Sequence, residues 1–258
     1  MNLNYKKIGE GGKPLFILHG VFGSLDNWGT LGKIISEAGY TVYLVDQRNH
    51  GRSPHSADHN YQLMAEDLKE LIDTVGAKDS ILIGHSMGGK TVMQFAVNWP
   101  DLLSKLIVVD IGPKAYPIHH KRRINGMKSI NLQTLKSRNE ADELLKPYER
   151  SLGIRQFLLK NLYRDGDAGF KWRFNLDTLE KDMPLVGEPL QYSNQFEKET
   201  LFIKGELSDY ILDEDWKLIS EIFLKAKLVT IKDADHWVQA DQPQIFVEEV
   251  LKFLGNSN

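Results

Sequence analysis

Short apolar runs alternate with amphipathic stretches along the first part of the chain. The runs lack the polar residue at every second position that marks a strand with one solvated face, so they indicate strands buried on both faces. Buried strands separated by helices are typical of a parallel sheet that helices cover on both sides. We therefore predict a doubly wound, mostly parallel α/β sheet with strands at Pro14–His19, Thr41–Asp46, Ile81–Gly84 and Lys105–Asp110 and helices at Trp28–Ala38, Met64–Val75 and Lys90–Trp99.

The alternation stops in the middle of the chain. Residues 113–196 are richer in charge and in helical spacing, and no run among them has the character of a buried strand. We predict that they form a helical cap, inserted into an α/β core made of residues 1–112 and 197–258. After the insertion we expect strands at Thr200–Gly205 and Ala226–Ile231 and a last helix with Asp241 as its N-cap and Pro243 in its first turn.

The charge balance and the missing residue types exclude several classes of function. The 258 residues include 32 basic and 35 acidic side chains, a net charge of −3, without a basic stripe for a nucleic-acid backbone. The absence of cysteine excludes a disulfide framework, a thiolate metal site and a cysteine nucleophile. No His-Glu-x-x-His or comparable ligand cluster occurs. Since neither a secretory signal nor an apolar stretch of membrane length is present, we expect a cytoplasmic protein with no metal, no nucleic-acid partner and no membrane span.

One pentapeptide, Gly84-His85-Ser86-Met87-Gly88, lies where a predicted strand changes into a predicted helix. A serine with a glycine two positions away on each side, between a strand and a helix, is typical of a nucleophile elbow. That turn is so tight that only glycine tolerates its close contacts, and it pushes the serine hydroxyl away from the sheet. The sequence therefore predicts Ser86 as a catalytic nucleophile.

A serine hydroxyl is a weak nucleophile near neutral pH and needs a base, which a carboxylate holds in one orientation. With an elbow serine, the acid and the histidine follow later in the chain, each in a loop after a strand. His236 fits the base, because it follows the last predicted strand. Asp110 ends a predicted strand, whereas Asp209 lies one residue beyond the position, three after Gly205, that commonly carries an acid in that loop. We take Asp110 as the acid and keep Asp209 as the alternative.

Acyl transfer also needs N–H donors directed at the oxygen that becomes negatively charged. The backbone N–H of Met87, directly after the serine, is one candidate. The second should come from the turn at residues 19–23, whose glycines let the chain bend back toward Ser86. Val21 is the first choice for this second oxyanion-hole donor, and Phe22 is the next.

The elbow belongs to a wider set of motifs: His19–Trp28, Asp46–Ser53, Gly84–Lys90, Gln156–Lys160 and Trp172–Asn175. Together they resemble the α/β-hydrolase superfamily over nearly the whole chain, and more narrowly its YbfF-type acyl esterases. The resemblance implies a cofactor-free hydrolase of short- to medium-chain acyl esters, or of acyl-CoA thioesters. It places the family's serine, acid and histidine at Ser86, Asp110 and His236. A carboxylate at Asp209 departs from that branch and leaves the acid assignment open.

Apolar side chains of the predicted cap are candidates for the lining of an acyl pocket. Helices pack on a core through the same residues, so pocket and packing roles stay equally open. The basic run at residues 121–123, Lys121, Arg122 and Arg123, faces either a charged head group or, more commonly for such a run, solvent. The pocket candidates are Phe157 and Trp172 in the cap and Phe22 in the first turn, and Leu158, Leu162 and Phe174 share the same ambiguity.

Two rival interpretations remain open. A cofactor-free perhydrolase or a carbon-carbon bond hydrolase can use the same three side chains, so the motifs do not separate these from an esterase. A non-catalytic binding protein on the same scaffold is disfavoured by a complete serine, aspartate and histidine set. The expected partner is a small acyl ester or thioester, and the sequence leaves the oligomeric state open.

Overall fold

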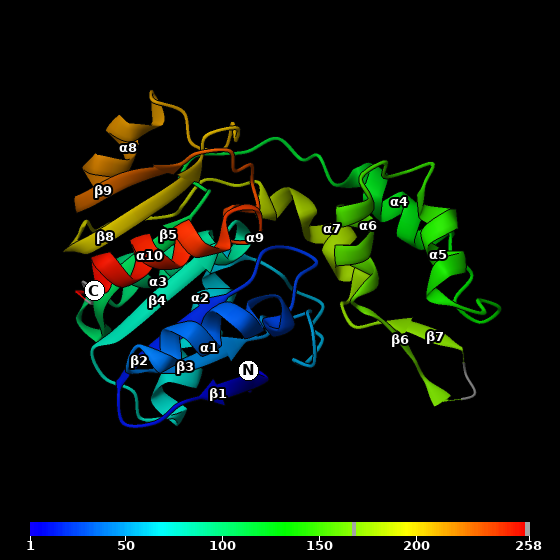
Figure 1. The fold of residues 1–258 in the computed structure, drawn as a ribbon, viewed down its shortest axis with the longest axis horizontal. Coiled ribbons are helices and arrows are strands. Elements are labelled where there is room, and N and C mark those ends of the chain that lie inside the picture. Colours follow the sequence, from blue (N-terminus) through cyan, green and yellow to red (C-terminus); the bar gives the residue numbers. More distant parts are fainter. Residues whose placement is uncertain (167–168, 256–258) are drawn as a thin grey trace.

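A seven-stranded sheet lies at the centre of the larger part of the molecule in the computed structural model, which describes residues 1–166 and 169–255 (Figure 1). The strand order is β1-β3-β2-β4-β5-β8-β9, and neighbouring strands are parallel except that β1 runs antiparallel to β3. The prediction of a doubly wound, mostly parallel sheet is confirmed. The strands are β1 (Tyr5–Ile8), β2 (Lys13–Leu18), β3 (Tyr40–Val45), β4 (Ser80–His85), β5 (Leu103–Val109), β8 (Phe196–Gly205) and β9 (Phe223–Ile231).

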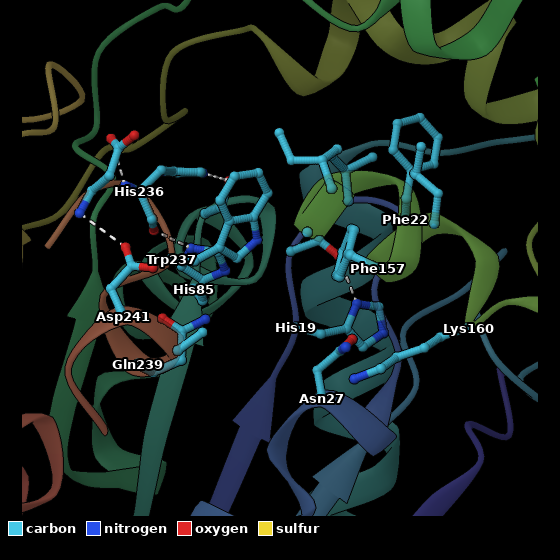
Figure 2. Close-up of a pocket in the computed structure, with 18 of the residues that line it drawn as sticks. His19, Phe22, Asn27, His85, Phe157, Lys160, His236, Trp237, Gln239 and Asp241 are labelled. Atoms are coloured by element: carbon cyan, nitrogen blue, oxygen red, sulfur yellow. Dashed lines mark hydrogen bonds between the residues drawn. The ribbon is translucent and has the colours of Figure 1, made fainter. Parts of the chain in front are cut away.

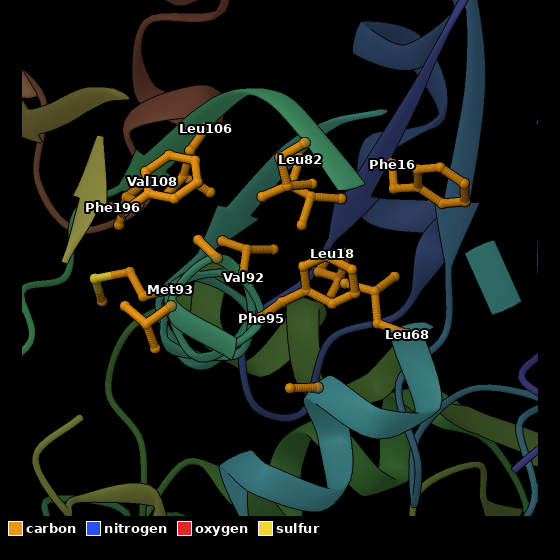
Figure 3. Packing of buried hydrophobic residues seen from close by; sticks show 14 of the residues in the cluster. Phe16, Leu18, Leu68, Leu82, Val92, Met93, Phe95, Leu106, Val108 and Phe196 are labelled. Atoms are coloured by element: carbon orange, nitrogen blue, oxygen red, sulfur yellow. The ribbon is translucent and has the colours of Figure 1, made fainter. Parts of the chain in front are cut away.

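Helices cover both faces of this sheet, because successive side chains of each strand point to opposite faces. Phe16 and Leu18 pack in one cluster with side chains of α2, α3 and α8, part of which Figure 3 shows. Leu15 and Ile17 pack in another cluster, with side chains of α1 and α10. No helix within residues 1–166 and 169–255 is long and apolar enough to cross a membrane. The helices of the core are η1 (Leu25–Trp28), α1 (Gly29–Glu37), α2 (Tyr61–Thr74), α3 (Met87–Asn98), η2 (Pro100–Leu102), α8 (Asp215–Ile222), α9 (Val238–Asp241) and α10 (Pro243–Leu254).

The segment between β5 and β8, which we call the cap segment, lies to one side of the sheet in Figure 1. Its apolar side chains form a hydrophobic cluster of their own, which also includes Phe22 of the core. The segment contains a hairpin that the sequence did not predict, because each of its strands has only 3 residues and pairs only with the other. Its elements are α4 (Lys121–Ser129), α5 (Arg138–Leu145), α6 (Leu152–Leu159), β6 (Leu162–Arg164), β7 (Phe170–Trp172) and α7 (Leu176–Val186).

Several predicted boundaries differ from the structure. Phe196, the last residue of the predicted insertion, is the first residue of β8. Asp241 is not the N-cap of the last helix: Gln242 occupies that position, because Pro243 with its fixed φ is the first helical residue. The Asp241 carboxylate instead accepts a hydrogen bond of 2.9 Å from the N–H of Asp235. Strand β1 was also missed, since its exposed, lysine-bearing edge has no alternating apolar pattern.

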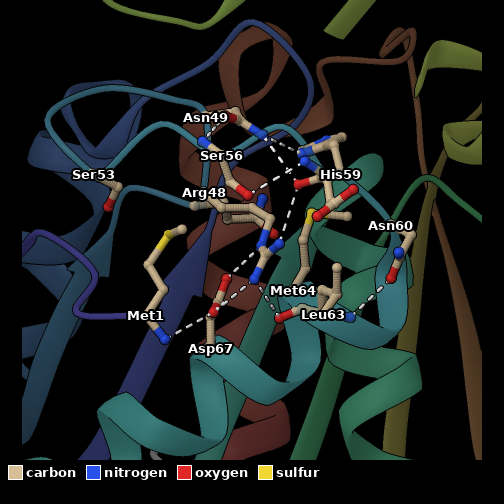
Figure 4. A network of polar contacts seen from close by, with 12 residues as sticks. Met1, Arg48, Asn49, Ser53, Ser56, His59, Asn60, Leu63, Met64 and Asp67 are labelled. Carbon is tan, nitrogen blue, oxygen red and sulfur yellow. Dashed lines mark hydrogen bonds and ion pairs between the residues drawn. The ribbon is translucent and has the colours of Figure 1, made fainter. Parts of the chain in front are cut away.

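A buried ion pair holds the loop after β3 against α2 (Figure 4). Arg48 Nε lies 2.6 Å from Asp67 Oδ2, and Arg48 Nη1 donates to the carbonyl of Asp58 at 3.1 Å. The next residue of this loop, His59, donates its backbone N–H to Asp182 of α7 at 2.9 Å. The ion pair therefore supports a loop that in turn contacts the cap segment.

Lys90 joins α3 to both ends of the cap segment. Its fully buried ammonium donates to the carbonyl of Lys114, in the connecting chain at the start of the cap segment, at 2.7 Å. It also donates to the carbonyl of Glu188, in the connecting chain at the end of the segment. The two connecting chains are also paired with each other, since Leu190 N–H donates to Pro113 at 2.8 Å. Burial lowers the pKa of Lys90 to about 7. The helix that follows the predicted nucleophile is thus tied to the connections of the cap segment.

Candidate active site

Ser86 lies in a strained turn between β4 and α3, with φ at 54° and ψ at −118°. A non-glycine residue with positive φ costs free energy and persists only where its surroundings enforce it. A Cβ on Gly84 would lie 2.2 Å from the Gly88 carbonyl oxygen, and one on Gly88 would lie 2.5 Å from that of Leu18. Neither position therefore has room for a side chain, and the turn has the geometry of a nucleophile elbow.

Three side chains that are far apart in the sequence meet at this turn. Ser86 Oγ lies 3.0 Å from His236 Nε2, and His236 Nδ1 lies 2.9 Å from Asp110 Oδ2. Asp110 directly follows β5 and is fully buried, while the His236 side chain is 14% exposed in the loop after β9. Parallel strands deliver their carboxyl-terminal loops to one edge of a sheet, which is why the three positions converge.

The His236 imidazole is held on more than one side. The neutral imidazole of His85 donates from Nε2 to the His236 carbonyl at 2.8 Å, and burial lowers the pKa of His85 to about 3. The ring of Tyr210 stacks on the imidazole with 3.8 Å between the ring centroids. His85 was predicted only as a residue of the elbow, so its contact with the His236 backbone was not foreseen.

The surroundings of Asp110 distinguish it from Asp209. One Asp110 carboxylate oxygen accepts from the N–H of Gly205 at 3.0 Å, and the other accepts from the hydroxyl of Ser208 as well as facing His236. Asp209 is exposed and forms no hydrogen bond or ion pair with any residue in the described part of the chain. Ser208 occupies the loop position where an acid commonly lies. Its hydroxyl donates to the carboxylate of Asp110, which follows the neighbouring strand β5. The place of Ser208, three residues after Gly205, was the signal in the sequence that could have identified its role.

The two candidate donors in the turn after β2 differ in whether their N–H is already paired. Phe22 N–H donates to His50 Nε2 at 3.1 Å, and His50 Nδ1 donates to the Arg48 carbonyl at 2.9 Å. Burial keeps His50 neutral by lowering its pKa well below the usual value, which suits an accepting Nε2. Within residues 1–166 and 169–255, the N–H groups of Val21 and Met87 donate to no acceptor. Of the two candidates in this turn, Val21 has the available donor.

A cavity of about 750 Å³ opens at Ser86 between the core and α6 of the cap segment (Figure 2). Phe22 and Phe157 line it, as does Leu158. Trp172 does not line it: this side chain is buried in the cap and stacks on Phe174 at a centroid distance of 5.2 Å. Leu162 is fully buried in the same cap cluster. Some of the predicted pocket residues therefore line the cavity, and others pack inside the cap segment.

The basic run of α4 also divides. Arg123 lines the cavity, and its Nε lies 2.7 Å from a carboxylate oxygen of Glu149. Lys121 and Arg122 do not line it, and the Arg122 guanidinium donates instead to the Pro147 carbonyl at 2.6 Å. Among the described residues, no three histidine or acidic side chains are grouped so that they could hold a metal ion.

Comparison with known proteins identifies the family. Residues 13–138 match a family model described as the alpha/beta hydrolase fold. The sn-1-specific diacylglycerol lipase ABHD11 of Mus musculus is 38% identical over 248 residues, which cover 93% of this chain and 80% of the relative. The chain belongs to the α/β-hydrolase family. The esterase YbfF of Escherichia coli (strain K12) is 32% identical over 94% of this α/β-hydrolase and 93% of its own length.

A solved structure agrees with these sequence relatives. The structure described as a marine microorganism esterase is 45% identical to this α/β-hydrolase and has a TM-score of 0.95, over 98% of this chain and 99% of that one. The expected family and its YbfF-type esterase relatives are confirmed, and the chain is a serine hydrolase enzyme.

Proposed function

We propose that this enzyme, a hydrolase of ester substrates, is a carboxylesterase for short- to medium-chain acyl groups that acts through an acyl-enzyme on Ser86. The observation that carries the proposal is the continuous chain from Ser86 Oγ through His236 to Asp110, with steps of 3.0 and 2.9 Å. Distances of this size are within hydrogen-bond reach for nucleophile and base.

In the first half of the proposed reaction, Ser86 Oγ attacks the ester carbonyl carbon while His236 Nε2 takes its proton. The buried Asp110 carboxylate holds Nδ1–H and stabilises the imidazolium that forms. The carbonyl oxygen becomes an oxyanion and accepts hydrogen bonds from the N–H groups of Val21 and Met87, each worth a factor on the order of 10² to 10³ in kcat. The tetrahedral intermediate then expels the alcohol, which receives the proton from His236.

In the second half, a water molecule attacks the acyl carbonyl of the Ser86 ester. His236 takes one proton from this water, and a second tetrahedral intermediate forms at the same oxyanion site. Its collapse returns the proton to Ser86 Oγ and releases the carboxylic acid. The enzyme is regenerated without a cofactor.

The substrate range of the proposal rests on the cavity and on the relatives. About 750 Å³ of cavity, lined by Phe22, Phe157 and Leu158 beside Ser86, accommodates a short or medium acyl chain. An acyl-CoA thioester presents the same carbonyl chemistry to Ser86, so we include it in the proposed range. The relatives named as diacylglycerol lipase and esterase place glycerol esters among the compounds to test.

A fluorophosphonate probe and a graded substrate series test this function. We expect the probe to label the wild-type chain and not Ser86→Ala, with p-nitrophenyl esters and acyl-CoAs of increasing length turned over only by the labelled protein. Labelling of Ser86→Ala to the same extent would contradict the serine mechanism. Wild-type turnover of a peracid-forming reaction or of a carbon-carbon substrate above that of every ester would favour the rival hydrolases on the same side chains.

A further inference from the structure

The two N–H groups proposed for the oxyanion hole lie on different elements, that of Val21 in the turn after β2 and that of Met87 at the start of α3. The turn and the helix are in close contact, since a Cβ on Gly88 would lie 2.6 Å from the His19 carbonyl oxygen. One oxygen atom of the substrate has to accept from both N–H groups, so a shift of the turn against the helix weakens at least one of these hydrogen bonds. The contacts that join the turn to the helix therefore bear on the reaction.

A buried side chain, Gln47, connects the turn to the helix. It belongs to the loop after β3 and is only 2% exposed. Its Nε2 donates to the carbonyl of His19 at 2.7 Å, and its Oε1 accepts from the hydroxyl of Thr91, a residue of α3, at 2.8 Å. The opposite orientation of the amide would place its oxygen against the His19 carbonyl oxygen, so the partners fix which atom is which. The amide thus uses one polar group on each element.

On the side of the turn, Gln47 also determines which nitrogen of His19 carries the proton. The backbone N–H of Gln47 lies 3.1 Å from His19 Nε2 and can only donate, so Nε2 accepts. Nδ1 then carries the proton and donates to the carbonyl of Gly20 at 2.8 Å. Burial lowers the pKa of His19, which favours this neutral form. The Gly20 carbonyl and the Val21 N–H belong to the same planar peptide group, so this hydrogen bond helps to fix the direction of the Val21 N–H.

On the side of the helix, Thr91 connects Gln47 to the residue that follows the nucleophile. Thr91 lies one helical turn after Met87, and its hydroxyl is 3.1 Å from the Met87 carbonyl as well as 2.8 Å from Gln47. Thr91 is fully buried, and neither Thr91 nor Gln47 lines the cavity. These two side chains therefore act on the reaction only through the groups that they hold.

We propose that Gln47 is a positioning residue of the oxyanion hole: its amide holds the turn that carries the Val21 N–H in place against the helix that carries the Met87 N–H. The inference rests on the proposed esterase function. Loss of the amide leaves the buried His19 carbonyl and the Thr91 hydroxyl without this partner, and the turn shifts to pair them elsewhere. The charged tetrahedral intermediates are then stabilised less well, whereas binding of the uncharged ester before the attack is unaffected.

The test replaces Gln47 by methionine, which has a similar length and no amide. We expect Gln47→Met to lower kcat for p-nitrophenyl butanoate about tenfold, with KM within about twofold of the wild-type value. A short alkyl trifluoromethyl ketone, whose carbonyl carbon adds Ser86 Oγ and whose oxygen becomes the oxyanion, should bind about tenfold more weakly. The matched control is Gln244→Met, at an exposed position of α10, for which kcat and ketone binding stay at the wild-type values.

Thr91→Val is the second variant, because it removes the hydroxyl at the other end of the same connection and keeps the size of the side chain. It should also lower kcat without changing KM. When it is added to Gln47→Met, it should cause little further loss, since both substitutions remove one hydrogen bond. Active-site titration with a fluorophosphonate corrects kcat for any unfolded fraction. Should Gln47→Met fail to fold, the kcat of Thr91→Val decides in its place.

A wild-type kcat in the folded variant would overturn the inference, as would a loss confined to KM. Additive losses in the double variant would also overturn it, because the two side chains would then act separately. A wild-type enzyme that neither hydrolyses the ester nor binds the ketone would contradict the esterase function itself. A wild-type enzyme that does both, with the variants unchanged, would contradict only the role of Gln47.

Discussion

The core and the cap segment contribute side chains to the active-site cavity in different ways. The core supplies the proposed reacting groups from the ends of β4, β5 and β9, and backbone hydrogen bonds hold two of them: Ser86 N–H donates to the Val109 carbonyl at 3.0 Å and Asp110 N–H donates to the Ile203 carbonyl at 2.8 Å. The cap segment presents side chains from α4 and α6 and packs around a separate hydrophobic cluster. Catalysis tolerates little displacement of the groups that react, so positions fixed by the sheet suit these groups. Side chains on the surface of a helix can be replaced without moving those positions.

Many of the contacts between the two regions are polar. Asn161 donates to the Phe22 carbonyl at 2.7 Å, and Asn175 N–H donates to the Asn49 carbonyl at 2.9 Å. Apolar contacts join the regions as well: Phe22 lies in the turn after β2 and packs in the cap cluster, and Val186 of α7 packs against Met64 and Met87 of the core. The comparison implies that substitutions in the core should change the rate of every substrate together, and that substitutions in the cap should change the order of preference among substrates.

The largest expected effect concerns the core. We expect Ser86→Ala to lower kcat for p-nitrophenyl butanoate by a factor on the order of 10⁶, and His236→Ala to be comparably impaired, since nucleophile and base act as a unit. Both variants should keep the wild-type circular dichroism spectrum. Near-native kcat in Ser86→Ala would remove the serine mechanism, and a His236→Ala that changes only KM would require another base.

Next in size is the effect of the acid. Asp110→Asn should lower kcat by up to about 10⁴, because the imidazole loses the charge that orients it. Asp209→Asn, at an exposed position, should change kcat by roughly twofold or less. Steady-state kinetics on one ester ranks the two variants. The reverse ranking would identify Asp209 as the acid, and equal intermediate losses would mean that either carboxylate serves His236.

A pair of cap variants tests the distinction between lining and packing. Trp172→Ala should lower the free energy of unfolding by about 3 kcal/mol or more, since it leaves a cavity beside Phe174, without changing the preferred acyl length. Phe157→Ala enlarges the cavity and should shift the kcat/KM ratio of longer to shorter acyl esters by roughly tenfold. Urea unfolding and an ester series from acetate to decanoate measure both. A shift caused by Trp172→Ala and absent in Phe157→Ala would reverse the two assignments.

The smallest effect concerns pH and the loop that joins core and cap. Burial lowers the pKa of His59 to about 3, whereas in the unfolded chain it has the ordinary value of about 6.5. The unfolded state therefore binds the extra proton between these values, so stability falls as the pH drops below about 6.5. From pH 7.5 to 5.0 this histidine should cost about 2 kcal/mol, and His59→Gln should reduce the wild-type loss by that amount in urea titrations. Identical pH dependence in both proteins would contradict a neutral buried His59.

Much of the core could be predicted from the sequence because its signals are local. The apolar runs of the parallel strands and the glycines around Ser86 each express a constraint within a few residues, and the structure brings Ser86, Asp110 and His236 together. The cap was harder, because residues such as Trp172 and Phe157 have the same chemistry in a pocket and in a packed cluster. The short hairpin of the cap has strands too brief to leave a pattern.

The sequence by itself determined the α/β alternation and the tight glycine-flanked turn at Ser86, because these depend on local backbone sterics and on the period of apolar residues. It also predicted the order of serine, acid and histidine along the chain. Only the tertiary structure decided which aspartate faces His236, that Phe22 N–H is already paired with His50, and that Gln47 joins His19 to Thr91. These facts depend on contacts between segments 28 to 126 residues apart and on what remains unpaired once they form. The spacing of residues in the sequence does not predict such contacts, because the packing of the other elements sets the direction of each side chain.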